Sequence, residues 1–271
     1  PTHLGPEVAN TYLAEVKKLS VRSDGDRSLS IVYTPMHGVG RDTLVEAVAR
    51  AGFPALHVVR EQAEPDPDFP TVAFPNPEEP GAMDLSLKLA SEVGADIIVA
   101  NDPDADRCAV GVRDGESYRM LSGDQVGALL ADFLLRRGVT GTYAASIVSS
   151  DLLGRQAKAH GQPWQQTLTG FKWIGKIPDL AFGYEEALGY AVAPDIARDK
   201  DGVSAIITVL ELAAGLKAEG RTLVDRLDEI YREHGLHSTT QLSVRVEDLE
   251  IIRRAMDTLR TTPPTTLGGQ A

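Results

Sequence analysis

The stretch Ile97-Ile98-Val99-Ala100-Asn101-Asp102-Pro103-Asp104-Ala105-Asp106-Arg107 decides how the rest of the chain is interpreted. Its first four residues form an unbroken apolar run, which is typical of a buried strand. The turn residues that follow end that strand. Asp102, Asp104 and Asp106 then occupy alternate positions, and alternate residues of an extended or turning segment project the same way. We therefore expect the three carboxylates to converge on one point.

Three carboxylates held close together repel one another. A hard divalent cation such as Mg2+ removes that repulsion because it prefers oxygen ligands. Arg107 follows the aspartates directly, and its planar guanidinium suits a phosphate group. The alternative is an acidic surface turn that holds no metal. Ligands usually bind at the ends of buried strands in α/β proteins, so the position favours a metal site.

The composition is that of a folded protein with a strong acidic balance. The chain has 271 residues, which indicates about two domains, and 42% of them are hydrophobic, enough for packed cores. The net charge of -12 argues against nucleic acid or an anionic membrane as the main partner, but leaves small phosphate ligands open. No signal peptide or membrane-length apolar run is present, so the cytoplasm is the expected location.

The first half alternates strands and helices, as a parallel sheet covered by helices does. Helices are expected over 4–20, 41–51 and 83–93, strands over 29–33, 56–59 and 97–100, and a hairpin over 108–121. Loop 34–40 carries glycines, a weak phosphate signal, and its His37 either donates to a phosphate or packs within the loop. Loop 61–80 is too long for an ordinary connection and is either mobile or functional. The single cysteine, Cys108, excludes an internal disulfide and is expected to be a buried thiol.

The second half repeats this alternation. Helices are expected over 123–137, 152–160, 203–218 and 223–234, and strands over 143–148, 165–168 and 180–184. The sequence therefore predicts an α/β fold of two similar βα-repeat domains, 1–118 and 119–235, with mixed, mostly parallel sheets covered by helices. A strand over 242–246 and a helix over 250–259 stand apart, so 236–271 is expected to be a connector toward a C-terminal domain.

Charged side chains recur at the strand ends of the second half. Lys172 lies in a loop after one strand, Glu185 and Glu186 end the next strand, and Lys200 precedes a long helix. Parallel βα units place such residues on one edge of the sheet. Glutamates there suit sugar hydroxyls, and lysines suit phosphate or proton transfer. Surface ion pairs are the alternative for any one of these residues alone.

Five motifs occur in a fixed order, and a family resemblance rests on them. They are Thr34-Pro35-Met36-His37-Gly38-Val39-Gly40, Asn101-Asp102-Pro103-Asp104-Ala105-Asp106-Arg107, Thr169-Gly170-Phe171-Lys172-Trp173-Ile174, Gly183-Tyr184-Glu185-Glu186-Ala187-Leu188-Gly189-Tyr190 and Arg198-Asp199-Lys200-Asp201-Gly202. Together they resemble the α-D-phosphohexomutases, the phosphoglucomutase and phosphomannomutase family, over roughly residues 1–235. The Glu-Glu-Ala-Leu-Gly form is most similar to the phosphoglucomutase and phosphopentomutase branch.

The resemblance implies four domains around a central cleft, of which this chain holds the second and third. The expected site has Mg2+ ligands Asp102, Asp104 and Asp106, catalytic residues Lys200 and Arg107, and substrate-binding residues Lys172, Glu185, Glu186 and His37. Many relatives have a serine two residues after the first glutamate. Ala187 stands at that position here, so one sugar hydroxyl contact is expected to be absent.

The whole enzyme would interconvert a sugar 1-phosphate and its 6-phosphate, or 5-phosphate for a pentose, through a phosphoserine and a bisphosphate. Phosphoglucomutase is the first expectation, and phosphomannomutase and phosphopentomutase are the alternatives. Neither the family's phosphoserine loop nor its C-terminal phosphate clamp occurs in this sequence. We therefore expect the chain alone to be inactive, a piece of a longer protein whose N- and C-terminal domains are missing.

Two other classes of protein fit parts of the pattern. A non-catalytic sugar-phosphate-binding module would use the same two domains without the serine loop. A haloacid-dehalogenase-like phosphatase also has an aspartate-rich strand end. Its nucleophilic aspartate directly follows the first strand, however, whereas the aspartates here follow an interior strand. The phosphatase therefore ranks last.

Overall fold

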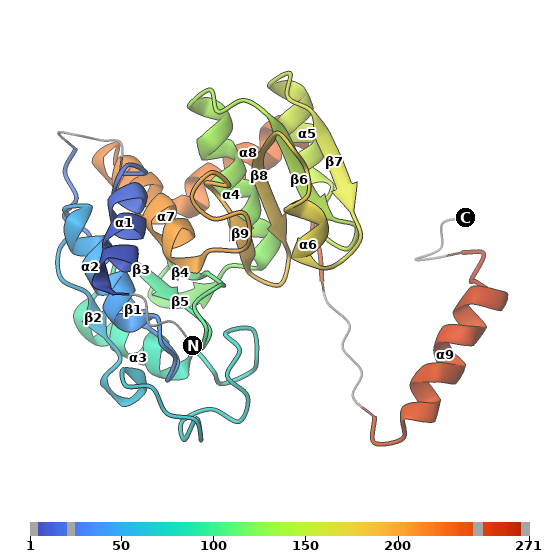
Figure 1. Ribbon diagram of the computed structural model, residues 1–271, viewed down its shortest axis with the longest axis horizontal. Helices are drawn as coiled ribbons and strands as arrows, with labels where there is room; N and C mark the ends of the chain where they lie inside the picture. The colour runs from blue at the N-terminus through green and yellow to red at the C-terminus, as the bar shows by residue number, and fades with distance from the viewer. Residues whose placement is uncertain (1–4, 21–24, 241–245, 267–271) are drawn as a thin grey trace. The chain divides into compact units, whose positions relative to one another are not determined.

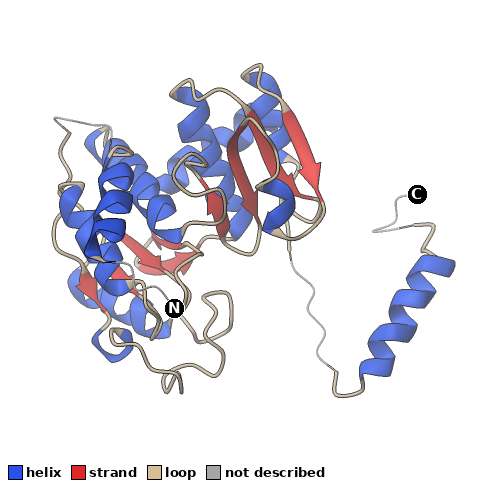
Figure 2. Ribbon diagram, viewed as in Figure 1, coloured by secondary structure: helices blue, strands red, loops and turns tan. Residues whose placement is uncertain are grey.

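The computed structural model describes residues 5–20, 25–240 and 246–266. The chain separates into two compact units, Pro1–His237 and Ser238–Ala271. The first unit holds two β-sheets with their helices (Figures 1 and 2). The second unit holds helix α9 (Leu249–Thr261), which covers the helix predicted over 250–259. The strand predicted over 242–246 falls, except for its last residue, outside the described residues.

The first sheet has five strands in the order β2 (His57–Val58), β1 (Ile31–Thr34), β3 (Ile97–Ala100), β4 (Ala109–Asp114) and β5 (Ser117–Met120). β2, β1 and β3 are parallel, while β4 is antiparallel to both β3 and β5. Every residue of β1 and β3 is buried, as expected for strands covered on both faces. Thr34 pairs with Ala100, so the loops after these two strands leave the same edge of the sheet.

The second sheet has the order β7 (Trp164–Thr167), β6 (Thr142–Ser146), β8 (Leu180–Glu185) and β9 (Gly189–Ala191). Here β7, β6 and β8 are parallel, and β9 is antiparallel to β8. The predicted α/β fold with two mixed sheets is therefore confirmed. The two sheets meet where Arg107 forms an isolated bridge with Gly189.

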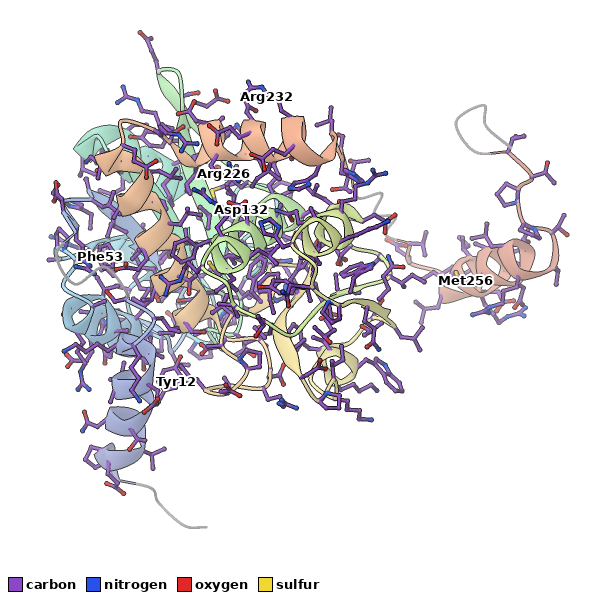
Figure 3. The ribbon with its side chains drawn as sticks, turned by 90° about the horizontal axis from the view of Figure 1, so that it is seen from above. Tyr12, Phe53, Asp132, Arg226, Arg232 and Met256 are labelled. Atoms are coloured by element: carbon purple, nitrogen blue, oxygen red, sulfur yellow. The ribbon has the colours of Figure 1, made fainter. Side chains whose placement is uncertain are left out.

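Helices surround both sheets. They are α1 (Pro6–Lys17), α2 (Arg41–Arg50) and α3 (Asp84–Val93) in the first half, and α4 (Gly123–Arg136), α5 (Leu152–Ala159), α6 (Phe171–Ile174), α7 (Gly202–Ala218) and α8 (Leu223–His234) in the second. A buried ion pair joins α8 to α4, because Arg226 and Asp132 point toward each other with Nη2 and Oδ1 2.6 Å apart (Figure 3).

Helix α7 links the two halves into one core. Its sequence is apolar on all sides, and a helix with that pattern must be buried all round. It contacts α1 and α2 as well as α4, α8 and β9, and one continuous hydrophobic cluster includes residues of both sheets. Cys108 lies in this cluster as a free thiol whose pKa is raised by burial. The predicted domain limits 1–118, 119–235 and 236–271 stay predictions.

Candidate functional site

The loop after β3 brings its three carboxylates together. One carboxylate oxygen from each of Asp102, Asp104 and Asp106, here called the aspartate cluster, lies within 4.8 Å of the others. The turn is closed by the Ala105 N–H, which donates to the Asp102 carbonyl at 2.9 Å. The Arg107 N–H donates to Asp102 Oδ1 at 3.0 Å. The convergence predicted from alternate spacing is therefore present.

Hydrogen bonds from buried polar side chains fix the conformation of this loop. Asn101 donates from Nδ2 to the Arg107 carbonyl at 2.6 Å, and it accepts from the Tyr33 hydroxyl at 3.0 Å. The glycine-containing loop 34–40, which follows β1, contacts the same segment. The Val39 N–H donates to the Pro103 carbonyl at 2.9 Å, and a Cβ at Gly38 would lie 2.3 Å from Pro103 Cα. In this structure the glycines allow one loop to approach another.

The aspartate cluster has the electrostatics of a cation site. Burial raises the pKa of Asp102 to about 6, and the charges of Asp106 and Asp104 add to the effect, although the Arg107 N–H opposes it. The Arg107 side chain offsets part of this charge, with Nε 3.2 Å from Asp102 Oδ2. Three oxygen ligands and an excess of negative charge fit a hard divalent cation.

Lys200 comes to the cluster from the second half of the chain. Its Nζ lies 2.9 Å from Asp106 Oδ2 and 5.5 Å from the centroid of the Phe171 ring. Its alkyl chain covers Gly189, where a Cβ would lie 2.3 Å from Lys200 Cδ. Burial alone would lower the pKa of Lys200, but the hydrogen bond and charge of Asp106 outweigh it and the pKa is raised. Lys200 is therefore a proton donor in this state.

The glutamates at the end of β8, here called the glutamate pair, are held by neutral donors. Glu185 Oε1 accepts from the Gly170 N–H at 2.6 Å. Glu186 Oε2 accepts from Ser146 Oγ at 3.1 Å and from Ser149 Oγ at 2.9 Å. Each carboxylate keeps further lone pairs for a ligand. Glu185 also lies close enough for its charge to raise the pKa of Lys200.

Two predicted site residues, Lys172 and His37, have contacts other than with the aspartate cluster or the glutamate pair. Lys172 is exposed, and its Nζ lies 5.6 Å from the centroid of the Trp173 ring. His37 is only 4% exposed, and its Nε2 lies 2.8 Å from Thr71 Oγ1. The backbone N–H of His37 also donates to the Gln62 carbonyl at 2.9 Å. His37 thus anchors the long loop over 61–80, which is the loop-packing alternative, and its phosphate contact stays a prediction.

Sequence reasoning missed Glu78. This residue lies in the long loop and lines a cavity of about 400 Å3 together with Ser122 and Leu188. Burial raises the pKa of Glu78, the charge of Arg107 lowers it, and the charge of Glu186 raises it further. Glu78 therefore lies within electrostatic range of one residue beside the aspartate cluster and one of the glutamate pair. The sequence marks the whole loop 61–80 by its length, but Glu78 itself only by the pair of adjacent acids. That signal is equally typical of a solvated turn.

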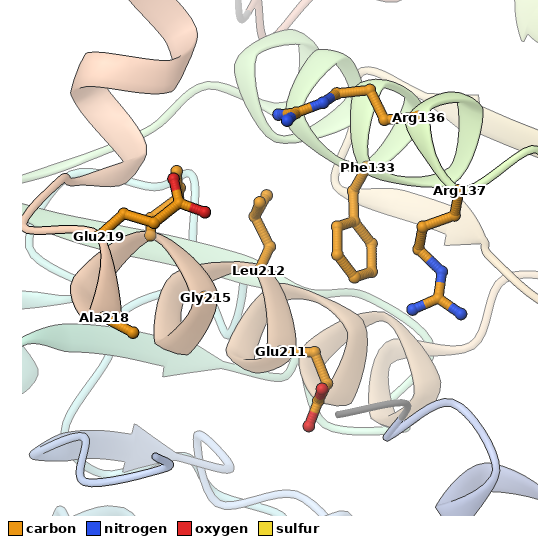
Figure 4. A pocket seen from close by; sticks show the side chains of 9 residues that line it. Phe133, Arg136, Arg137, Glu211, Leu212, Gly215, Ala218 and Glu219 are labelled. Carbon is orange, nitrogen blue, oxygen red and sulfur yellow. The ribbon is translucent and has the colours of Figure 1, made fainter. Parts of the chain in front are cut away.

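A separate cavity of about 390 Å3 lies between α4 and α7 (Figure 4). Phe133 of α4 and Leu212 of α7 extend into the space between the helices, and Arg136 and Arg137 lie at the end of α4. None of the described residues that line it belongs to the predicted site.

Within the described ranges, no helix is both long and apolar enough to cross a membrane.

The fold and the site define a two-sheet α/β protein with an acidic cluster at the edge of one sheet and a glutamate pair at the edge of the other. Residues 10–115 match the family description "Phosphoglucomutase/phosphomannomutase, alpha/beta/alpha domain II". Residues 122–234 match domain III of the same family. The chain belongs to the phosphoglucomutase/phosphomannomutase family.

Similar proteins carry mutase names. A "Probable phosphomannomutase" of Haemophilus influenzae is 47% identical over 98% of this chain and 55% of its own length. A "Phosphopentomutase" of Homo sapiens is 38% identical over 93% of this chain and 45% of its own length. The crystal structure of a putative phosphomannomutase from Thermus thermophilus matches with a TM-score of 0.72 and 26% identity, over 84% of this chain and 51% of that one. The chain therefore spans about half the length of these relatives.

Proposed function

We propose that this chain forms the metal-binding and sugar-binding centre of a phosphohexomutase, which interconverts a sugar 1-phosphate and a 6-phosphate, or 5-phosphate for a pentose. The observation that carries the proposal is the ion pair between Lys200 and Asp106, 2.9 Å from Nζ to Oδ2. It joins the half of the chain that holds the glutamate pair to the half that holds the aspartate cluster. A single ligand can then contact both.

In this proposal the aspartate cluster holds Mg2+. The fit rests on its three converging oxygens and on the raised pKa of Asp102, which shows that the uncompensated charge is unfavourable. A bound Mg2+ would supply positive charge toward the phosphoryl group that is transferred. Arg107, beside the cluster, supplies a guanidinium of the shape that binds phosphate oxygens.

Lys200 is the proposed proton-transfer residue. When the free sugar hydroxyl attacks the phosphoserine, its proton would pass to the neutral amine of Lys200. The resulting ammonium, which the raised pKa of Lys200 favours, would then donate that proton to the other sugar oxygen when its phosphoryl group returns to serine. The glutamate pair would bind sugar hydroxyls with the lone pairs that Gly170, Ser146 and Ser149 leave free.

The phosphoryl donor lies outside this sequence in our proposal. The family's phosphoserine loop and its phosphate clamp have no counterpart in these 271 residues, and the chain spans about half of each curated relative. We therefore propose that turnover through phosphoserine and a bisphosphate requires further domains. The chain alone would bind metal and sugar phosphate without turning the sugar over.

A substrate panel tests the function. The full gene product that contains these residues is assayed with Mg2+, a trace of bisphosphate and the 1-phosphates of glucose, mannose and ribose. We expect one of them to be converted to its 6- or 5-phosphate. Glucose 1-phosphate is the first expectation, because of the Glu-Glu-Ala-Leu-Gly motif. The names of two relatives, a probable phosphomannomutase and a phosphopentomutase, support mannose and pentose phosphates as the alternatives. The same assay on the 271-residue chain should show no turnover.

The panel also decides between the proposal and its rivals. Tight binding of a sugar phosphate without turnover by the full gene product would favour the non-catalytic binding module. Release of inorganic phosphate with a trappable phosphoaspartate would favour a phosphatase. Isomerisation by the 271-residue chain alone would refute the proposed need for further domains.

A further inference from the structure

Helix α1 reaches the N-terminus of α7 through one tyrosine. The Tyr12 hydroxyl donates to the Asp201 carboxylate, and its oxygen lies 2.7 Å from Oδ1 and 2.9 Å from Oδ2. Tyr12 lies on α1 (Figure 3) and is half-buried, and Asp201 is 9% exposed. Burial, together with the charge and the hydrogen bond of Asp201, raises the pKa of Tyr12. The hydroxyl is therefore a permanent donor at neutral pH.

Asp201 accepts hydrogen bonds from both α7 and Tyr12, and the Tyr12 hydroxyl lies within reach of both of its oxygens. Oδ1 caps the helix, because it accepts from the N–H groups of Val203 at 3.1 Å and Ser204 at 3.3 Å. Oδ2 accepts from Tyr12, and among the described residues no other donor bonds it. Loss of the tyrosine hydroxyl would leave a nearly buried carboxylate oxygen without a partner. The carboxylate would then turn or move toward water.

The residues on both sides of Asp201 contact the aspartate loop. The Gly202 N–H donates to the Ala105 carbonyl at 3.2 Å, and a Cβ on Gly202 would lie 2.2 Å from the Arg107 carbonyl oxygen. On the other side, Lys200 Nζ reaches Asp106 Oδ2 at 2.9 Å. A displaced carboxylate at position 201 would therefore disturb the backbone that carries Lys200.

We propose that Tyr12 is a positioning residue of the mutase site, which fixes Lys200 beside the aspartate cluster through Asp201. The inference rests on the proposed function, in which Lys200 transfers the proton. Tyr12 acts through Asp201 and bonds no atom of the proposed ligand-binding groups. Its hydroxyl therefore affects the chemical step and not the binding of the sugar phosphate.

Tyr12→Phe in the full gene product tests the inference with two readouts. We expect kcat to fall about tenfold, which lies within the effect of other groups that orient a site residue, while KM stays unchanged. In the same preparation, limiting acetylation followed by mass spectrometry compares the reactivity of Lys200 with that of Lys172. We expect Lys200 to become several-fold more reactive relative to Lys172. The labelling requires no catalysis.

Two further variants separate positioning from ordinary stability. Tyr118 donates its hydroxyl to the Ala95 carbonyl at 2.6 Å, outside the site, so Tyr118→Phe should lower Tm without changing kcat or the labelling. Asp201→Ser keeps a good N-cap, but serine is too short to reach Tyr12. In that background Tyr12→Phe should have no further effect on kcat.

The kcat and labelling results together decide whether Tyr12 positions Lys200. Unchanged kcat and unchanged labelling of Lys200 in Tyr12→Phe would overturn the proposal, even with a lower Tm. A lower kcat with unchanged labelling would also overturn it, because Tyr12 would then act elsewhere. Altered labelling in a protein whose wild type converts no sugar phosphate would support the positioning of Lys200 and overturn the proposed function.

Discussion

The two sheets present acidic side chains at their edges in different ways. At the first sheet, the aspartate cluster crowds three carboxylates within 4.8 Å, and its charge is offset by the side chains of Arg107 and Lys200. At the second sheet, the glutamate pair is held by neutral donors, a backbone N–H for Glu185 and two serine hydroxyls for Glu186. The aspartate cluster is therefore stabilised by positive charge, whereas the glutamate pair is stabilised by hydrogen bonds from neutral groups.

This difference separates a site that binds a metal ion from a site that forms hydrogen bonds with sugar hydroxyl groups. Crowded carboxylates raise one another's pKa until a cation joins them. A carboxylate fixed by neutral donors keeps its orientation and offers its remaining lone pairs to a ligand. We therefore expect changes at the aspartate cluster to alter metal affinity, and changes around the glutamate pair to alter sugar-phosphate affinity alone.

The largest effect is expected for Asp104→Asn. Asp104 is exposed, so the change removes one charge and one ligand without disturbing the core. The Mg2+ affinity of the chain is measured by calorimetry. Mutation of a residue that only supports a metal ligand lowers affinity roughly 10–100-fold, and loss of the ligand Asp104 should lower it by more. Asp114→Asn, in the exposed turn of the β4–β5 hairpin, is the matched control. Unchanged affinity in Asp104→Asn would place the metal elsewhere.

A pH titration should change metal affinity by about tenfold. Burial and its acidic neighbours raise the pKa of Asp102 from 3.8 to about 6, so protons compete with Mg2+ below that pH. The calorimetric affinity should fall about tenfold between pH 7.5 and 5, given one competing proton. Equal affinity at both pH values would contradict this.

The same pKa predicts how the stability of the metal-free chain depends on pH. Folded Asp102 binds its proton more tightly than the unfolded chain does, since its pKa lies above 3.8. Its contribution to the free energy of unfolding is therefore complete below about pH 4 and is lost as pH rises through about 6. Asp102→Asn should remove that part of the pH dependence of Tm, and added Mg2+ should raise the wild-type Tm more at pH 7.5 than at pH 5.

Lys200→Gln should tighten Mg2+ binding. The ammonium lies 2.9 Å from an oxygen of Asp106 and competes with the metal for the same negative charge. Because Lys200 keeps some solvent contact, the expected gain is only about fivefold. Lys176→Gln removes a lysine that lies over the Trp173 ring instead, and it should leave the affinity unchanged. Weaker binding in Lys200→Gln would mean that Lys200 supports the metal ligands.

The smallest effect is expected for Ser149→Ala. Ser149 Oγ lies 2.9 Å from Glu186 Oε2 and 3.0 Å from the Glu186 backbone nitrogen. Its loss should weaken binding of glucose 1,6-bisphosphate by the chain about threefold, near the lower end of what one hydrogen bond contributes, and leave Mg2+ affinity unchanged. Ser91→Ala, on exposed α3, is the control. A change in Mg2+ affinity in Ser149→Ala would break the separation between the two groups of acids.

Local pattern was enough for the elements and for the aspartate cluster. The apolar run Ile97–Ala100 became β3, and alternate spacing brought the three carboxylates together, because both features depend only on residues next to one another in the chain. The same reasoning left two roles open for His37, a phosphate donor and a loop-packing residue. Its Nε2 contact with Thr71 depends on how the long loop folds, which no periodicity in the sequence indicates.

The sequence by itself determined the two βα-repeat sheets, the strand ends at which the acids lie and the long helix expected over 203–218. Tertiary structure alone decided that Lys200 meets Asp106, that Tyr12 meets Asp201 and that the charge of Arg107 acts on Glu78. Local residue preferences fix which face of an element is buried. Which elements then meet depends on how α7 packs between the two sheets, and that packing is settled only when the whole core forms.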